Sequence, residues 1–153
     1  MRNQYKRNTI KWALALTLGL TTAFPVAAAQ TPTSLDGVTV VSADDVKKLL
    51  DAGVPVIDTR VAAEYAEKTI KGAKSVPYKE KSAKSPDFDA SLDRFDLAKL
   101  PAEKSAPVVF FCNAGECWKS YKASVLATRA GYTQVRWFRG GVPEWTSKGL
   151  PTQ

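Results

Sequence analysis

The sequence lacks several features on which common functions depend. It contains no histidine among its 153 residues, which excludes hydrolases of the ordinary Cys-His and Ser-His kinds. It contains only two cysteines, so a zinc site built from cysteine and histidine ligands is not expected. We therefore predict no metal ion and no other cofactor. Any chemistry must come from side chains other than imidazole.

Long hydrophobic runs are also absent, apart from one near the N-terminus, residues 12–20 (WALALTLGL). This run is shorter than the roughly 20 residues that span a bilayer. Basic residues precede it without any acidic residue, and Ala27-Ala28-Ala29 before Gln30 fits a cleavage site. We interpret residues 1–29 as a cleaved signal peptide, which predicts export, with the periplasm as the favoured compartment. An uncleaved anchor is the alternative; after cleavage no stable membrane insertion is expected.

The chain has no run of like charges, although its net charge is +7. Removal of residues 1–29 takes away four cations and leaves 18 basic against 15 acidic residues, a net charge of +3. These charges are interspersed, as on an ordinary solvated surface. We therefore predict no nucleic-acid partner.

The remaining chain is long enough for one domain. Residues 30–36 are polar and are interpreted as a flexible lead-in, and residues 37–153 as the domain. Short apolar segments alternate with amphipathic ones, which predicts a three-layer α/β/α fold with a mainly parallel central sheet. Strands are expected over 37–41, 54–58, 73–76, 107–111 and 133–138, and helices over 42–53, 61–67, 120–130 and 142–148.

Residues 79–106 interrupt this alternation and are rich in lysine, serine, aspartate and proline. The spacing of four apolar residues within them suggests one helix packed against the domain: Leu92, Phe95, Leu97 and Leu100. The default interpretation of the remainder is surface decoration, with a pocket wall or a partner surface as alternatives.

The two cysteines, Cys112 and Cys117, lie in one loop that follows the most apolar predicted strand, 107–111. Ligands of α/β sheets bind beyond the carboxyl ends of the strands. A strand–loop–helix segment can aim several backbone N–H groups at one point, which favours a thiolate, and Gly115 keeps that point open. A structural disulfide is the plain alternative, but so short a loop would restrain little entropy.

Three segments of the chain together resemble a rhodanese-like (rhodanese-homology) sulfurtransferase domain. The first is Val56-Ile57-Asp58-Thr59-Arg60 with Glu64-Tyr65 and Ile70-Lys71-Gly72-Ala73; the second is VVFFC with a glycine three residues after the cysteine; the third is Arg139-Gly140-Gly141 with Trp145 and Gly149-Leu150-Pro151. They occur in family order and span most of residues 38–151. The chain is thus similar to an exported single-domain member with a Cys-x4-Cys-Trp loop.

The resemblance implies that Cys112 is the nucleophile and carries sulfane sulfur as a persulfide. It also implies that main-chain amides of the loop stabilise this persulfide; the candidate residues are Asn113, Ala114, Gly115, Glu116, Cys117 and Trp118. Asp58 and Arg60 would support the site, and a purely structural buried ion pair is the favoured interpretation of these two.

The loop departs from the family pattern at two positions. Thiosulfate-using members carry an arginine five residues after the cysteine, where this chain has Cys117. Bidentate anion binding is then lost, Glu116 adds a negative charge, and thiosulfate is expected to be a poor donor. Lys119 could replace part of the missing charge, although a solvated surface lysine is the favoured interpretation. Trp118 occupies the place of the arginine that related phosphatases need, so phosphatase activity is not expected.

The leading hypothesis is an enzyme that moves sulfane sulfur from a small donor to a thiol acceptor. Thiosulfate, a polysulfide or a persulfide could be the donor, with Cys117 as a candidate resolving cysteine that releases the sulfur and forms a disulfide. The alternatives are an exported thiol–disulfide redox protein that uses the same two cysteines and a binding module without turnover. The physiological donor and acceptor, the pathway and the oligomeric state stay open at this point.

Overall fold

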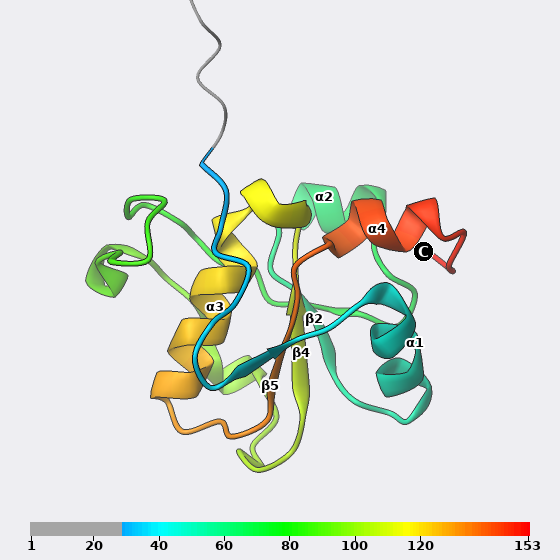
Figure 1. The fold of residues 1–153 in the computed structure, drawn as a ribbon, viewed down its shortest axis with the longest axis horizontal. Helices are drawn as coiled ribbons and strands as arrows, with labels where there is room; N and C mark the ends of the chain where they lie inside the picture. The colour runs from blue at the N-terminus through cyan, green and yellow to red at the C-terminus, as the bar shows by residue number, and fades with distance from the viewer. Residues whose placement is uncertain (1–28) are drawn as a thin grey trace, which may run out of the picture.

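The computed structural model describes residues 29–153, so all of the predicted signal peptide except Ala29 lies outside the described residues. A five-stranded sheet forms the centre of the fold, and every pair of neighbouring strands in it is parallel (Figure 1). The strand order is β1-β5-β4-β2-β3. The strands are β1 (Val38–Val40), β2 (Val56–Asp58), β3 (Lys74–Ser75), β4 (Val108–Phe111) and β5 (Val135–Phe138). The predicted α/β fold with a mainly parallel sheet is confirmed.

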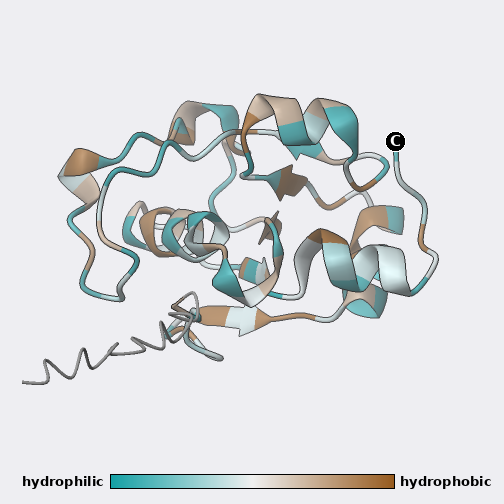
Figure 2. Cartoon of the chain, turned by 90° about the horizontal axis from the view of Figure 1, so that it is seen from above, coloured by the Kyte–Doolittle hydropathy of each residue, from teal (hydrophilic) through white to brown (hydrophobic). Residues whose placement is uncertain are grey.

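Helices cover both faces of this sheet. They are α1 (Ala43–Asp51), α2 (Ala62–Glu67), α3 (Trp118–Arg129) and α4 (Gly141–Ser147). The first begins at a capping box, in which Ser42 and Asp45 each satisfy the other's backbone N–H. Seen from above, the strands in the middle are largely hydrophobic, and the surrounding helices carry mixed faces (Figure 2). Within residues 29–153, no helix is both long and apolar enough to cross a membrane.

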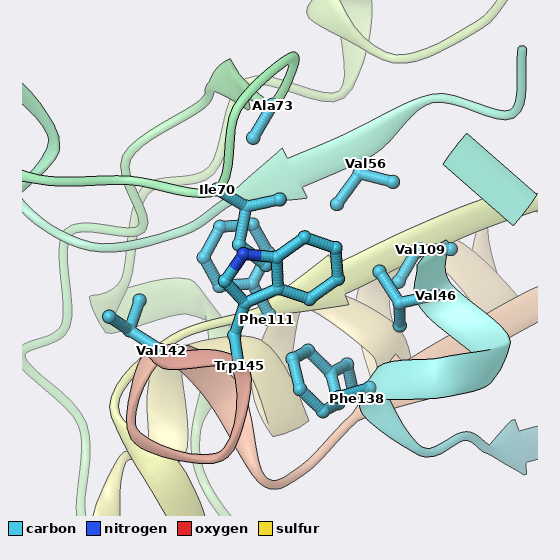
Figure 3. Packing of buried hydrophobic residues seen from close by; sticks show 10 residues of the cluster. Val46, Val56, Ile70, Ala73, Val109, Phe111, Phe138, Val142 and Trp145 are labelled. Carbon is cyan, nitrogen blue, oxygen red and sulfur yellow. The ribbon is translucent and has the colours of Figure 1, made fainter. Parts of the chain in front are cut away.

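The central strand β4 supplies the core on both sides because successive side chains point to opposite faces. Val109 and Phe111 belong to the cluster beneath α1 and α4, with the fully buried Trp145 at its centre (Figure 3). Val108 and Phe110 belong to the cluster beneath α3. Both faces are therefore closed, and the carboxyl end of β4 is where the loop with the cysteines begins.

The segment 79–106 differs from the prediction of a single helix. It contains two short 3-10 turns, η1 (Ala90–Leu92) and η2 (Leu97–Lys99). The side chains of Asp89 and Asp96 each accept a hydrogen bond from the backbone N–H two residues later. Such local bonds offer the backbone an alternative to a continuous helix. The single helix that the spacing of apolar residues predicts therefore does not form.

A buried lysine ties this segment to α3. Lys122 is fully buried, and its ammonium lies 2.9 Å from Glu80 Oε2 and 3.7 Å from Asp93 Oδ2. It also donates a 2.8 Å hydrogen bond to Ser82 Oγ. A buried charge is retained only with partners of this kind. The segment is thus part of the folded domain, and surface decoration alone does not describe it.

Candidate active site

The loop that contains both cysteines is compact. Cys112 directly follows β4, and residues Ala114–Glu116 form a third 3-10 turn, η3. Ala114 has a φ of +50°, a left-handed conformation that is uncommon outside glycine. Helix α3 then begins at Trp118, two residues before its predicted start. The first turn of that helix therefore lies beside the cysteine at the end of β4.

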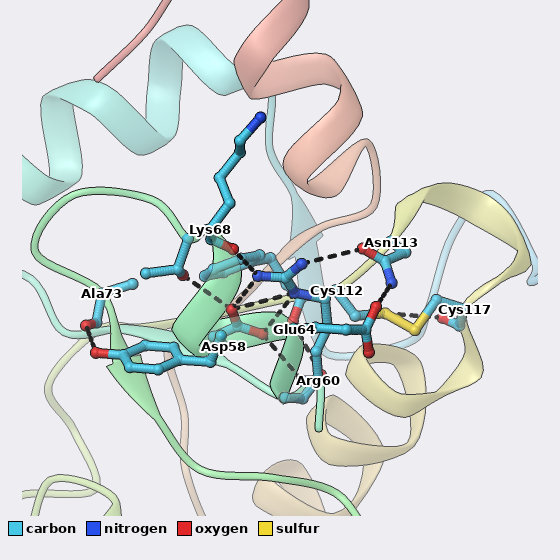
Figure 4. A network of polar contacts seen from close by, with 12 residues as sticks. Asp58, Arg60, Glu64, Lys68, Ala73, Cys112, Asn113 and Cys117 are labelled. Carbon is cyan, nitrogen blue, oxygen red and sulfur yellow. Dashed lines mark hydrogen bonds and ion pairs between the residues drawn. A yellow bond between two sulfur atoms is a disulfide. The ribbon is translucent and has the colours of Figure 1, made fainter. Parts of the chain in front are cut away.

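Cys112 and Cys117 are joined by a disulfide bond, with their Cα atoms 6.2 Å apart (Figure 4). Cys112 is only 1% exposed, whereas Cys117 is half-buried and lines a pocket of about 280 Å³. A thiol that enters this pocket therefore meets the sulfur of Cys117 first. Attack there would leave Cys112 as the departing thiolate.

The sulfur of Cys112 makes two polar contacts within the described chain. One is with Ser120 Oγ at 3.0 Å, and the other is with the carbonyl oxygen of Cys117 at 3.1 Å. Neither contact is a loop N–H, so in this disulfide-bonded form the role of the loop amides stays a prediction. Ser120 Oγ in turn accepts a 3.0 Å hydrogen bond from Trp137 Nε1.

Sequence reasoning missed both Ser120 and Trp137. The only available signal was a serine in the first turn of the helix that follows the loop. Its contact with the cysteine depends on where α3 begins, and the sequence predicts that start at Ser120, two residues after the observed one.

Asp58 and Arg60 form a buried ion pair at the carboxyl end of β2, the arrangement favoured from the sequence. Arg60 Nη2 lies 2.7 Å from Asp58 Oδ2 and donates a 2.6 Å hydrogen bond to the carbonyl oxygen of Lys68. The same guanidinium reaches Asn113 Oδ1 at 3.4 Å, and the amide of Asn113 donates to Glu64 (Figure 4). The pair therefore also holds the first residue after Cys112 in place.

Residues 29–32 lie against the loop, which the prediction of a flexible lead-in did not anticipate. Thr31 is only 3% exposed, and both its N–H and its hydroxyl donate to the carbonyl oxygen of Gly115, at 2.7 and 2.8 Å. Arg139 donates to Thr31 Oγ1 and to the carbonyl oxygens of Thr31 and Pro32 at 3.0–3.1 Å. The indole of Trp118 donates to the carbonyl oxygen of Ala29 at 2.9 Å.

The pocket beside Cys117 is lined by charged side chains from three parts of the chain. Its lining residues are Glu64, Glu80, Lys84, Asn113, Glu116, Cys117, Trp118 and Lys119. Two of them, Glu80 and Lys84, belong to segment 79–106, which thus forms one wall of the pocket. Three carboxylates face two ammonium groups, so the lining does not favour a dianion. Lys119 lies at this pocket, and whether it replaces part of the missing positive charge stays a prediction.

Other hollows of the described surface are less closely linked to the cysteines. An apolar pocket of about 410 Å³ adjoins the first, since Glu80 and Lys119 line both, and Val61 and Tyr78 lie further along it. A larger groove of about 670 Å³ lies between segment 79–106 and Val76 and Pro77, which follow β3, and neither cysteine lines it. The chemistry of the loop therefore points to the smaller polar pocket and not to this larger groove.

Comparison with known proteins identifies the family of the chain. The family model of the rhodanese-like domain matches residues 42–148. The human thiosulfate:glutathione sulfurtransferase is 31% identical over 113 residues, which cover 73% of this chain and 96% of the relative. The chloroplastic thiosulfate sulfurtransferase 16 of Arabidopsis thaliana is 32% identical over 109 residues, covering 69% of this chain and 84% of the relative.

A solved structure shows the same fold. The polysulfide-sulfur transferase homodimer of Wolinella succinogenes superposes with a TM-score of 0.55 at 24% identity, covering 76% of this chain and 79% of that one. The parallel sheet, the cysteine at the carboxyl end of its central strand and the matched family model lead to one conclusion. The chain belongs to the rhodanese-like domain family.

Proposed function

We propose that this protein is an exported sulfurtransferase in which Cys112 carries sulfane sulfur as a persulfide and Cys117 resolves it. The relatives support sulfur transfer in general. The observation that carries the finer proposal is the pairing of a buried Cys112 with a half-buried Cys117 at the pocket. The first sulfur is positioned to hold the group, and the second to exchange with thiols from outside.

The transfer consists of two displacements that need no further oxidant. The Cys112 thiolate attacks the outer sulfur of a donor R–S–SH, the donor S–S bond breaks, and RS⁻ leaves. An acceptor thiolate then attacks the outer sulfur of the Cys112 persulfide, and Cys112 departs as the thiolate. Sulfur is thus moved with no net change in the protein.

The disulfide is the product of a second route, which the Cys112 persulfide takes when no acceptor reaches it. The Cys117 thiolate attacks the inner sulfur of the Cys112 persulfide, the disulfide forms, and HS⁻ leaves. A reducing dithiol must then open the disulfide before the next transfer. This route supports an acceptor that is itself a thiol, because the same class of molecule restores the resting enzyme.

The charge of the pocket bears on the donor. No arginine lines it, and Glu64, Glu80 and Glu116 do. A compact dianion such as thiosulfate lacks the bidentate partner that stabilises it elsewhere. A persulfide or polysulfide delivers sulfur without needing that partner. We therefore favour a persulfide or polysulfide over thiosulfate as the donor.

Mass spectrometry of the reduced full-length mature protein tests the proposal. After a single exposure to glutathione persulfide, the Cys117→Ser variant should retain one added sulfur atom on Cys112. The wild type should pass through that state to the disulfide, and the Cys112→Ser variant should carry no sulfur at this loop. A reduced, folded Cys117→Ser protein that takes up no sulfur would overturn the proposal.

The same experiment separates sulfur transfer from a simple thiol–disulfide relay, which the disulfide alone would also fit. A relay predicts cycling of the disulfide with dithiols and no persulfide under any condition. Release of sulfide in step with disulfide formation in the wild type supports the transferase. Export is tested separately, by sequencing the N-terminus of the protein recovered from its cell, where Gln30 is the expected first residue.

A further inference from the structure

Three buried groups are linked by successive polar contacts at the end of β4. Cys112, Ser120 and Trp137 are each about 1% exposed. Trp137 Nε1 is 3.0 Å from Ser120 Oγ, which is 3.0 Å from the sulfur of Cys112. They come from β5, α3 and the end of β4, so only the folded sheet brings them together.

The direction of each hydrogen bond in this series follows from the chemistry of its members. An indole nitrogen can only donate, so Trp137 occupies an acceptor position of the serine oxygen. The sulfur of a disulfide carries no hydrogen, so it can only accept. The hydroxyl proton of Ser120 is therefore directed at the sulfur of Cys112.

The other polar neighbour of this sulfur opposes negative charge. The carbonyl oxygen of Cys117 lies 3.1 Å away and is an acceptor. It would attract a thiol proton and repel a thiolate. Ser120 is then the side chain in direct contact that favours the anion, and its place in the first turn of α3 adds the partial positive charge of a helix N-terminus.

We propose that Ser120, oriented by Trp137, is a catalytic hydrogen-bond donor that stabilises Cys112 as the leaving thiolate. The inference rests on the proposed function and names a residue for it. When an acceptor thiolate attacks the outer sulfur of the persulfide, the S–S electron pair moves onto the Cys112 sulfur, where the Ser120 hydroxyl meets it. When a reductant attacks Cys117, the disulfide electron pair moves to the same atom.

Trp137 acts through the serine as a positioning residue. Its N–H fixes the acceptor side of the hydroxyl, so the proton cannot turn toward the indole. Without that N–H the Ser120 hydroxyl would be free to rotate, and it would donate to the Cys112 thiolate for only part of the time. Removal of the indole N–H is therefore expected to raise the pKa of the Cys112 thiol, but by less than removal of the Ser120 hydroxyl.

The test is a titration of the Cys112 thiol in the Cys117→Ser background, which has a single cysteine. The pKa is read from thiolate absorbance and from the pH dependence of alkylation. Ser120→Ala should raise the pKa by about one unit, which is about tenfold less thiolate at a pH below both values. Trp137→Phe should raise it less, and adding it to Ser120→Ala should change nothing further.

Ser124→Ala is the matched control, because Ser124 is a buried serine on the same helix whose hydroxyl donates to the carbonyl oxygen of Ser120 at 2.8 Å. It should leave the pKa of Cys112 unchanged. An unchanged pKa in folded Ser120→Ala overturns the inference. Since this titration uses no sulfur donor, its result is independent of whether Cys112 takes up sulfur.

Discussion

The backbone N–H of Val142 donates a 3.1 Å hydrogen bond to the carbonyl oxygen of Cys112. This bond joins the start of α4 to the end of β4. It is possible because the preceding residue, Gly141, has a φ of +57° and no side chain. A Cβ atom at Gly141 would overlap that carbonyl oxygen and approach the N–H of Ala114 to 2.8 Å. The position of the loop with the cysteines thus depends on Gly141, which lies in a distant part of the sequence.

Gly141→Ala should therefore displace the loop as well as strain the backbone. We expect it to cost several kcal/mol of unfolding free energy, on the order of 3 kcal/mol, and to slow sulfur transfer. Gly149→Ala is the control, since Gly149 has a φ of +65° with open space around its Cβ position. It should cost only about 1 kcal/mol. Equal losses in urea denaturation would contradict this explanation.

Low pH should destabilise the packing of segment 79–106, because it protonates Asp93. Burial raises the pKa of this carboxyl, but hydrogen bonds from Ser82, from the N–H of Lys81 and from Tyr78 outweigh it and lower the pKa from 3.8 to about 2. The depressed pKa stabilises the fold fully above pH 3.8, and this contribution is lost as the pH falls toward 2.

Asp93→Asn should remove that part of the pH dependence and lower the unfolding free energy at neutral pH by about 1–3 kcal/mol. Asp96→Asn, at an exposed position of the same segment, should leave the acid limb of the stability curve intact. Denaturant unfolding from pH 7 to pH 2 measures both. An acid limb that is the same in Asp93→Asn and wild type would refute the assignment.

The donor preference should respond to Glu116. Glu116→Gln removes one negative charge from the pocket and keeps an oxygen to accept the 2.9 Å hydrogen bond from Gln30. We expect turnover with thiosulfate to rise about threefold to tenfold at low salt, and the gain to shrink at high salt. Glu67→Gln, at an exposed position of α2 that does not line the pocket, should change neither the turnover with thiosulfate nor its salt dependence. A rise in both variants would assign the effect to net charge alone.

Arg139 should hold residues 30–32 against the loop. Arg139→Ala removes its hydrogen bonds to Thr31 and Pro32 and should speed hydrogen exchange at the N–H of Thr31 about tenfold. Reduction of the Cys112–Cys117 disulfide by a dithiol should also be faster, because Thr31 then holds the carbonyl group of Gly115 less firmly. Arg136, within β5, donates a hydrogen bond to Thr39 of β1; Arg136→Ala removes this bond and should affect neither measurement.

Much of the fold could be predicted from local pattern. The buried runs at 54–58 and 107–111 became β2 and β4, and Ser42 caps α1 as its side chain indicates. These features depend on neighbours within a few residues. The helix expected over Leu92 to Leu100 was wrong because Asp89 and Asp96 bind the nearby backbone, which an apolar spacing does not reveal.

The site was only partly predictable. The sequence alone determined that a cysteine would follow the central strand, because strand periodicity and the order of segments place Cys112 there. Only the tertiary structure decided what touches its sulfur and its loop: Ser120 with Trp137 behind it, Thr31 held by Arg139, and Glu80 held by the buried Lys122. These contacts join elements whose distance and orientation are set by packing across the sheet. No local pattern in the chain encodes them.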